Sequence, residues 1–66
     1  MTIKLRYLTQ EDKGRKVCYR EPYNGPGAKI QTGALVTWDN SFVYLRFDEP
    51  DAEPRNPEDC SFDLGN

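Results

Sequence analysis

The stretch that decides the fold is KIQTGALVTWDNSFVYLRF, residues 29–47. Residues 29–38 are rich in β-branched and aromatic side chains and predict a long strand. Residues 39–41, Asp-Asn-Ser, tolerate the backbone angles of a tight turn, and residues 42–47 return as a second strand. The stretch therefore predicts a β-hairpin.

Two features of this hairpin indicate how it packs. A glycine inside a strand favours a bulge or a sharp bend, so we expect the first strand to turn at Gly33 from one sheet to the next. On the return strand, alternation separates two trios of side chains: Val43, Leu45 and Phe47 on one face, and Phe42, Tyr44 and Arg46 on the other. The first trio is the expected core, because the second contains a charge.

The residues before the hairpin predict short elements. Residues 2–8 alternate apolar and polar side chains and suit either a first strand or an extended arm. Thr9 and Asp12 have the spacing of a capping box, which predicts one helical turn over residues 9–13, ended by Gly14. Residues 16–20 predict a strand, and residues 21–27, with two prolines and two glycines, predict a loop.

After the hairpin, residues 48–58 are acidic and contain three prolines, which predicts a loop. Pro57 suits the first position of a final helical turn. Residues 60–64 are long enough for a closing strand.

Composition restricts the class of protein. With 66 residues the chain has room for one small domain. It lacks an apolar run of the roughly 20 residues that cross a bilayer, and its first residues do not resemble a signal peptide, so we expect a cytoplasmic protein that does not act at a membrane. Residues 1–31 carry seven Lys+Arg against three Asp+Glu, a net charge of +4, whereas residues 32–66 carry two against eight, a net charge of −6. This asymmetry either orients a partner or only keeps the protein solvated.

The reactive side chains argue against catalysis. The chain has no histidine and two cysteines, Cys18 and Cys60, far apart in sequence. Without an imidazole neither thiol has an obvious activating base, and no set of metal ligands is apparent. Two reduced thiols are the expected state, with a disulfide as the alternative. We expect no enzyme activity, no metal and no cofactor.

Three segments resemble SH3-like barrels of the KOW and Tudor kind: DKGRKV at 12–17, GALVTW at 33–38 and FVYLRF at 42–47. The resemblance spans about residues 9–64. The same order, followed by Pro57-Glu58-Asp59 and an apolar segment, resembles small proteins encoded by bacterial phages and prophages. The resemblance implies one all-β domain over residues 1–66: a small SH3-like barrel of about five short, strongly bent antiparallel strands with one or two single-turn helices. It also implies a binding module, in host-cell cytoplasm if phage-encoded.

Two candidate surfaces follow. An aromatic face of Tyr23, Trp38, Phe42 and Tyr44 would bind another protein, or else these rings only cover the barrel. A basic segment of Lys13, Arg15, Lys16 and Arg20 would bind nucleic acid, with Tyr19 and Tyr23 available for stacking, or else it only solvates a strand.

The acidic tract Asp48, Glu49, Asp51 and Glu53 suits a solvated loop, a mimic of nucleic-acid charge or, less well, a calcium site. The leading hypothesis is a phage or prophage accessory protein that binds a protein partner as a monomer or weak homodimer. Nucleic-acid binding is the alternative.

Overall fold

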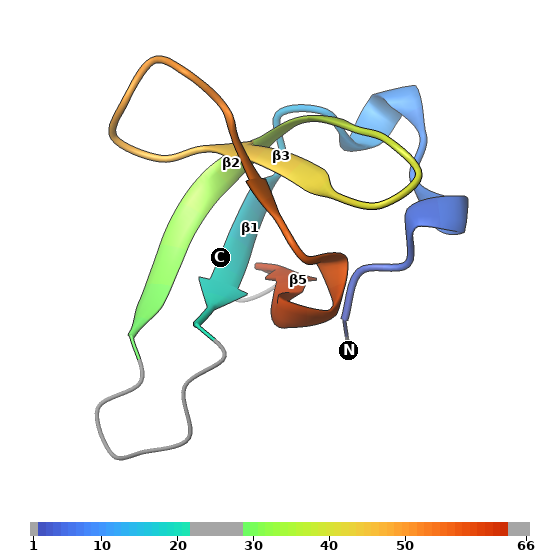
Figure 1. The fold of residues 1–66 in the computed structure, drawn as a ribbon. Helices are drawn as coiled ribbons and strands as arrows, with labels where there is room; N and C mark the ends of the chain where they lie inside the picture. Colours follow the sequence, from blue (N-terminus) through green and yellow to red (C-terminus); the bar gives the residue numbers. More distant parts are fainter. Residues whose placement is uncertain (1, 22–28, 64–66) are drawn as a thin grey trace.

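A computed structural model describes residues 2–21 and 29–63 and shows an all-β protein built on one antiparallel sheet (Figure 1). The sheet order is β4-β3-β2-β1-β5, so the chain runs from neighbour to neighbour until β5 returns to pair with β1. The strands are β1 Lys16–Arg20, β2 Ile30–Trp38, β3 Val43–Arg46, β4 Glu53–Arg55 and β5 Cys60–Phe62. Three single 3-10 turns accompany them: η1 Leu5–Tyr7, η2 Gln10–Asp12 and η3 Pro57–Asp59.

The all-β class and the turns η2 and η3 are as expected, whereas η1 is an additional turn within residues 2–8. Within residues 2–21 and 29–63, no helix is long and apolar enough to cross a membrane.

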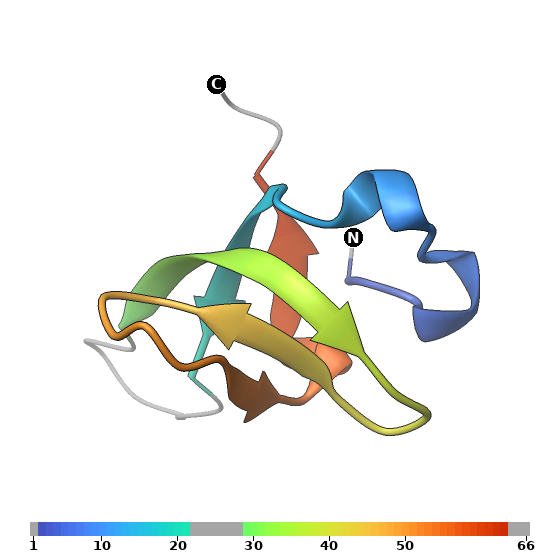
Figure 2. The ribbon, with the colours of Figure 1, turned by 90° about the horizontal axis from the view of Figure 1, so that it is seen from above.

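The long strand β2 exchanges partners near its middle. Residues 30–34 pair with β1, and from Ala34 onward the strand pairs with β3. Figure 2 shows β2 curving along its length, so that β3 runs across the direction of β1 and β5. A Cβ on Gly33 would lie 2.8 Å from the carbonyl oxygen of Arg46 and 2.8 Å from Cδ1 of Phe47. Glycine is needed here because β3 and the residue after it pass too close for a side chain.

The bulge that Gly33 suggested lies elsewhere. The register with β3 shifts between Leu35 and Thr37, so Val36 is the extra residue. Gly33 itself pairs regularly with Val17. The glycine permits a close approach of two strands, and the bulge follows it.

The core lies on the inner face of this bent sheet. Its fully buried residues come from four strands and the N-terminal arm: Ile3, Val17, Leu35, Val43, Leu45 and Cys60. Of the predicted trio, Val43 and Leu45 are fully buried and Phe47 is half-buried against them. The choice of face on the return strand is confirmed.

Residues 2–8 form an arm and contain no strand. Ile3 is buried in the core, and its N–H donates to the carbonyl oxygen of Cys60 at 2.9 Å. The arm then makes turn η1 and leads to η2. There the Thr9 N–H donates to Oδ2 of Asp12 at 2.9 Å, as the capping box predicted. Gly14 ends this part with φ +91°, a value that favours glycine.

The acidic segment contains a strand that the sequence did not predict. Glu53–Arg55 forms β4 at the edge of the sheet, where Pro54 pairs with Tyr44. A proline is tolerated there because one side of an edge strand has no neighbour to bond. The turn at Pro57 and the closing strand are both present, whereas Leu64 and most of the predicted loop 21–27 lie outside the described residues.

Cys18 and Cys60 are both free thiols. They lie on neighbouring strands, where Cys60 pairs with Tyr19 and Cys18 pairs with Ser61. Cross-strand partners share a face, so the two cysteines face opposite sides of the sheet. The strand register therefore opposes the alternative disulfide.

Candidate binding surfaces

The turn of the β2–β3 hairpin is held by one carboxylate. Oδ1 of Asp39 accepts the N–H groups of Ser41 and Phe42, each at 2.8 Å. Oδ2 accepts the hydroxyl of Tyr44 at 2.5 Å. The Tyr44 hydroxyl bond, followed by the two backbone N–H bonds, lowers the pKa of Asp39 below its ordinary 3.8, so the turn is held by a charged group at neutral pH.

This turn presents an exposed aromatic ring. Phe42, the residue before β3, is 44% exposed and lines a surface depression together with Tyr19 and Arg55. Tyr44, half-buried, lies two residues later on the outer face of β3. The turn thus presents one exposed ring beside the hairpin.

The predicted aromatic face is divided by the strand register. Trp38 pairs with Val43, which is fully buried, whereas Tyr44 pairs with Thr37. Trp38 therefore belongs to the inner face, where it packs against the core, and Nζ of Lys13 lies 5.7 Å from its ring centre. Tyr23 lies outside the described residues. Of the four predicted residues, the strand register places Tyr44 on the outer face and Trp38 on the inner face, and Phe42 lies in the turn before β3.

The predicted basic segment is also divided. Lys13 lies over the ring of Trp38. The guanidinium carbon of Arg15 lies 3.8 Å from the ring centre of Phe62. Nη1 of Arg15 also donates to Oδ1 of Asp12 at 2.9 Å. These two cations cover rings at the margin of the core. Tyr19, expected to stack bases, is instead half-buried under the guanidinium of Arg55.

Three other cations share the outer face of the sheet. Lys16 and Arg46 both pair with Ala34, from β1 and β3, and Arg20 lies on the same face of β1 as Lys16. All three are exposed. Arg46 is not part of the basic segment expected from the sequence. Arg46 lies beside Lys16 only because both pair with Ala34, one from each side of β2.

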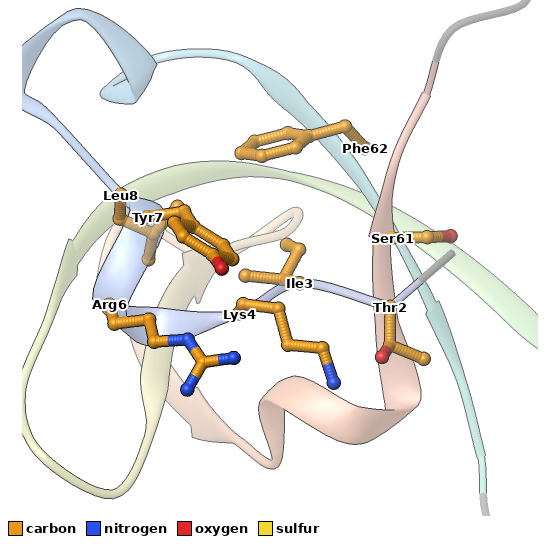
Figure 3. Close-up of a pocket in the computed structure, with 8 residues that line it drawn as sticks. All are labelled: Thr2, Ile3, Lys4, Arg6, Tyr7, Leu8, Ser61 and Phe62. Carbon is orange, nitrogen blue, oxygen red and sulfur yellow. The ribbon is translucent and has the colours of Figure 1, made fainter.

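A hollow of about 760 Å³ lies between the N-terminal arm and β5 (Figure 3). Its apolar lining, the floor of the hollow, comes from Ile3, Leu8 and Phe62, with the exposed Tyr7 at its edge. Lys4 and Arg6 lie at its rim, and the Arg6 guanidinium carbon is 5.1 Å from the Tyr7 ring centre. The sequence signal for this site is the alternation of cations with apolar residues over residues 3–7, which by itself predicts only a strand or an arm.

The acidic tract is spread along the chain. Asp48, Glu49 and Asp51 are exposed, whereas Glu53 belongs to β4 and its Oε1 accepts a hydrogen bond from Arg55 at 3.3 Å. Over residues 2–21 and 29–63, no three carboxylate or thiol side chains come together to hold a metal ion.

Comparison with family models, curated protein sequences and solved structures gives no match to this chain.

Proposed function

We propose that this protein is a non-enzymatic binding module that binds a protein partner through the surface around Phe42 and the turn of the β2–β3 hairpin. The observation that carries the proposal is the exposed Phe42 ring beside a turn held by three hydrogen bonds to Asp39. A fixed loop loses little conformational entropy on binding. An aromatic ring presented on such a loop is a typical anchor at protein interfaces.

The SH3-like barrel, with phage or prophage origin, belongs to the same proposal. Three features of the fold support the barrel: β5 returns to pair with β1, β2 is curved along its length (Figure 2), and the single turn η3 precedes the last strand. Small barrels of this kind serve as binding modules, although a fold alone does not define a function.

The test is affinity capture from a bacterial lysate with the wild-type protein and two variants. Phe42→Ser should abolish capture of the partner, whereas Thr32→Ser, an exposed change on β2, should retain it. Capture should depend weakly on salt, because the proposed contact is apolar. Equal capture by wild type and Phe42→Ser would refute the hairpin surface as the binding site.

Nucleic-acid binding is the second candidate, favoured by the row of Lys16, Arg20 and Arg46 on the outer face. Asp63 opposes it, because its N–H donates to the Lys16 carbonyl and it brings a carboxylate beside the row. If this function holds, DNA or RNA oligonucleotides will bind with an affinity that falls steeply with salt. Arg46→Glu will then abolish binding and Phe42→Ser will not.

A further inference from the structure

We propose that the hollow between the N-terminal arm and β5 binds an extended segment of a partner protein in which an apolar side chain is flanked by carboxylates. This site lies outside the hairpin surface described above. It does not depend on that surface being functional.

The floor of the hollow suits an apolar side chain. Ile3 is only 5% exposed and belongs to the core, so the floor is fixed in place. The Tyr7 ring, by contrast, is 68% exposed at the edge of the hollow. A leucine or phenylalanine side chain placed between Tyr7 and Phe62 would bury apolar surface that water now covers.

The rim determines the charge of the partner. Lys4 and Arg6 are two residues apart, and Figure 3 shows both side chains extending to the same side, away from Phe62. None of the residues that line the hollow, all within the described part of the chain, carries a carboxylate. The rim therefore attracts acidic residues on either side of the apolar anchor.

The edge of β5 offers backbone groups to an extended chain. The N–H of Asp63 donates to the Lys16 carbonyl, so Asp63 and Ser61, two residues earlier, direct their backbone groups toward β1. Cys60 and Phe62 direct theirs the opposite way, and the Cys60 carbonyl accepts the Ile3 N–H. The backbone of Phe62 thus faces the edge beside the hollow, where a peptide could add as a further strand.

A peptide fits the site better than a nucleic acid does. The chain has a net charge of −2, with −6 in residues 32–66, which repels a long polyanion. The floor includes aliphatic Ile3 and Leu8, which offer no stacking surface to a base. A segment with a few carboxylates around an apolar anchor avoids both problems.

The experiment is selection from a random heptapeptide library with four proteins: wild type, the Lys4→Glu/Arg6→Glu double variant, Tyr7→Ser and, as a control at an exposed cation outside the hollow, Lys29→Glu. We expect wild type and Lys29→Glu to enrich peptides that combine acidic and apolar residues. An enriched peptide, labelled with fluorescein, should bind the double variant and Tyr7→Ser at least about tenfold more weakly. NMR spectra of each variant establish that it is folded. In wild type, the peptide should shift the signals of Ile3, Tyr7 and Phe62.

Three results with peptides would overturn the proposal: a lack of enrichment, enriched peptides without acidic residues, and equal binding of the enriched peptide by wild type and the double variant. Shifts of the same three residues by single-stranded RNA or DNA, with no enriched peptide, would overturn it by assigning the hollow to nucleic acid. Loss of peptide binding in Phe42→Ser, added to the binding assay as a fifth protein, would overturn it by placing the site on the hairpin.

Discussion

The guanidinium carbon of Arg55 lies 5.1 Å from the ring centre of Tyr19, and this contact joins β4 to β1. The same guanidinium is 5.1 Å from the ring centre of Phe47, and the two rings are 6.5 Å apart. β4 and β5 are the two ends of the strand order, and in the described part of the chain no strand pairing joins them. Arg55 lies on β4, one end of the sheet, and Tyr19 lies on β1, which pairs with β5 at the other end. The packing of the Arg55 cation against the Tyr19 ring therefore links the two ends of the sheet.

Replacing Arg55 by alanine should destabilise the protein by about 1–2 kcal/mol, because both the cation and the packed stem are lost. Its ion pair with Glu53 adds little, since Glu53 is exposed to water. The measurement is urea unfolding. Arg46→Ala, an exposed arginine on the outer face, is the control and should change stability by less than about 0.5 kcal/mol. Equal effects of the two substitutions would contradict a role for Arg55 in closing the sheet.

Gly33→Ala should cost about 2 kcal/mol, because the new methyl group would meet the Arg46 carbonyl oxygen and the Phe47 ring at 2.8 Å. The carbonyl belongs to the backbone of β3 and can move only if the strand shifts. Denaturant unfolding measures the loss. Thr32→Ala, at the exposed neighbouring position, should cost less than about 1 kcal/mol. If the glycine variant is no less stable than the threonine variant, the close approach of β2 and β3 does not require glycine.

The parts of the fold that the sequence predicted depend on local patterns. Alternation over residues 42–47 gave the correct core face. The glycine in β2 marks the close approach of β3, whereas the bulge lies at Val36. β4 was missed because proline and acidic residues are typical of loops. Its pairing with β3 depends on a neighbour about ten residues away in the chain.

The binding surfaces were harder to predict than the fold. Whether Trp38 and Tyr44 share a face depends on the extra residue Val36 in β2, and no local signal gives its position. The hollow depends on the arm meeting β5 through Ile3 and Cys60, a contact between the two ends of the sequence. Side chains brought together by long-range pairing cannot be assigned to one site from spacing alone.

Tyr44→Phe should raise the pKa of Asp39 toward its ordinary 3.8, because the Tyr44 hydroxyl bond is the largest cause of the lowering. Because the pKa of Asp39 is lower in the folded state than in the unfolded state, the ionised carboxylate stabilises the folded protein at pH values above 3.8. This stabilisation is lost as the pH falls through the pKa of Asp39 in the folded state. The variant should therefore lose less stability on acidification over that range.

NMR titration of the side-chain carboxyl carbons measures this effect. Asp12 is the internal control: its pKa is lowered first by the Thr9 N–H and next by Arg15, so it should not respond to Tyr44→Phe. An unchanged Asp39 pKa in the variant would show that the hydroxyl does not hold the carboxylate in solution.

Cys60 should be unreactive in the folded protein, whereas Cys18 should react with a thiol reagent. Cys60 is 1% exposed, and its Sγ donates to the Asn56 carbonyl oxygen at 3.3 Å. Burial, followed by the charge of Asp59, raises the pKa of the Cys60 thiol to about 11, so little thiolate exists at pH 8. Cys18 is half-buried on the opposite face of the sheet.

The Cys18→Ser variant isolates the Cys60 thiol for measurement. Its reaction with DTNB at pH 8 should proceed only as the protein opens, and should accelerate with added urea. The Cys60 thiol ionises above pH 9 in the unfolded chain, but only near its raised pKa of about 11 in the folded protein. Ionisation therefore favours the unfolded chain, and the free energy of unfolding should fall as the pH rises above 9. A Cys60→Ala variant, which leaves Cys18 as the single thiol, should react without urea. Rapid native-state labelling of Cys60 would mean that β5 and the arm separate readily, and the hollow between them would then lack a fixed floor.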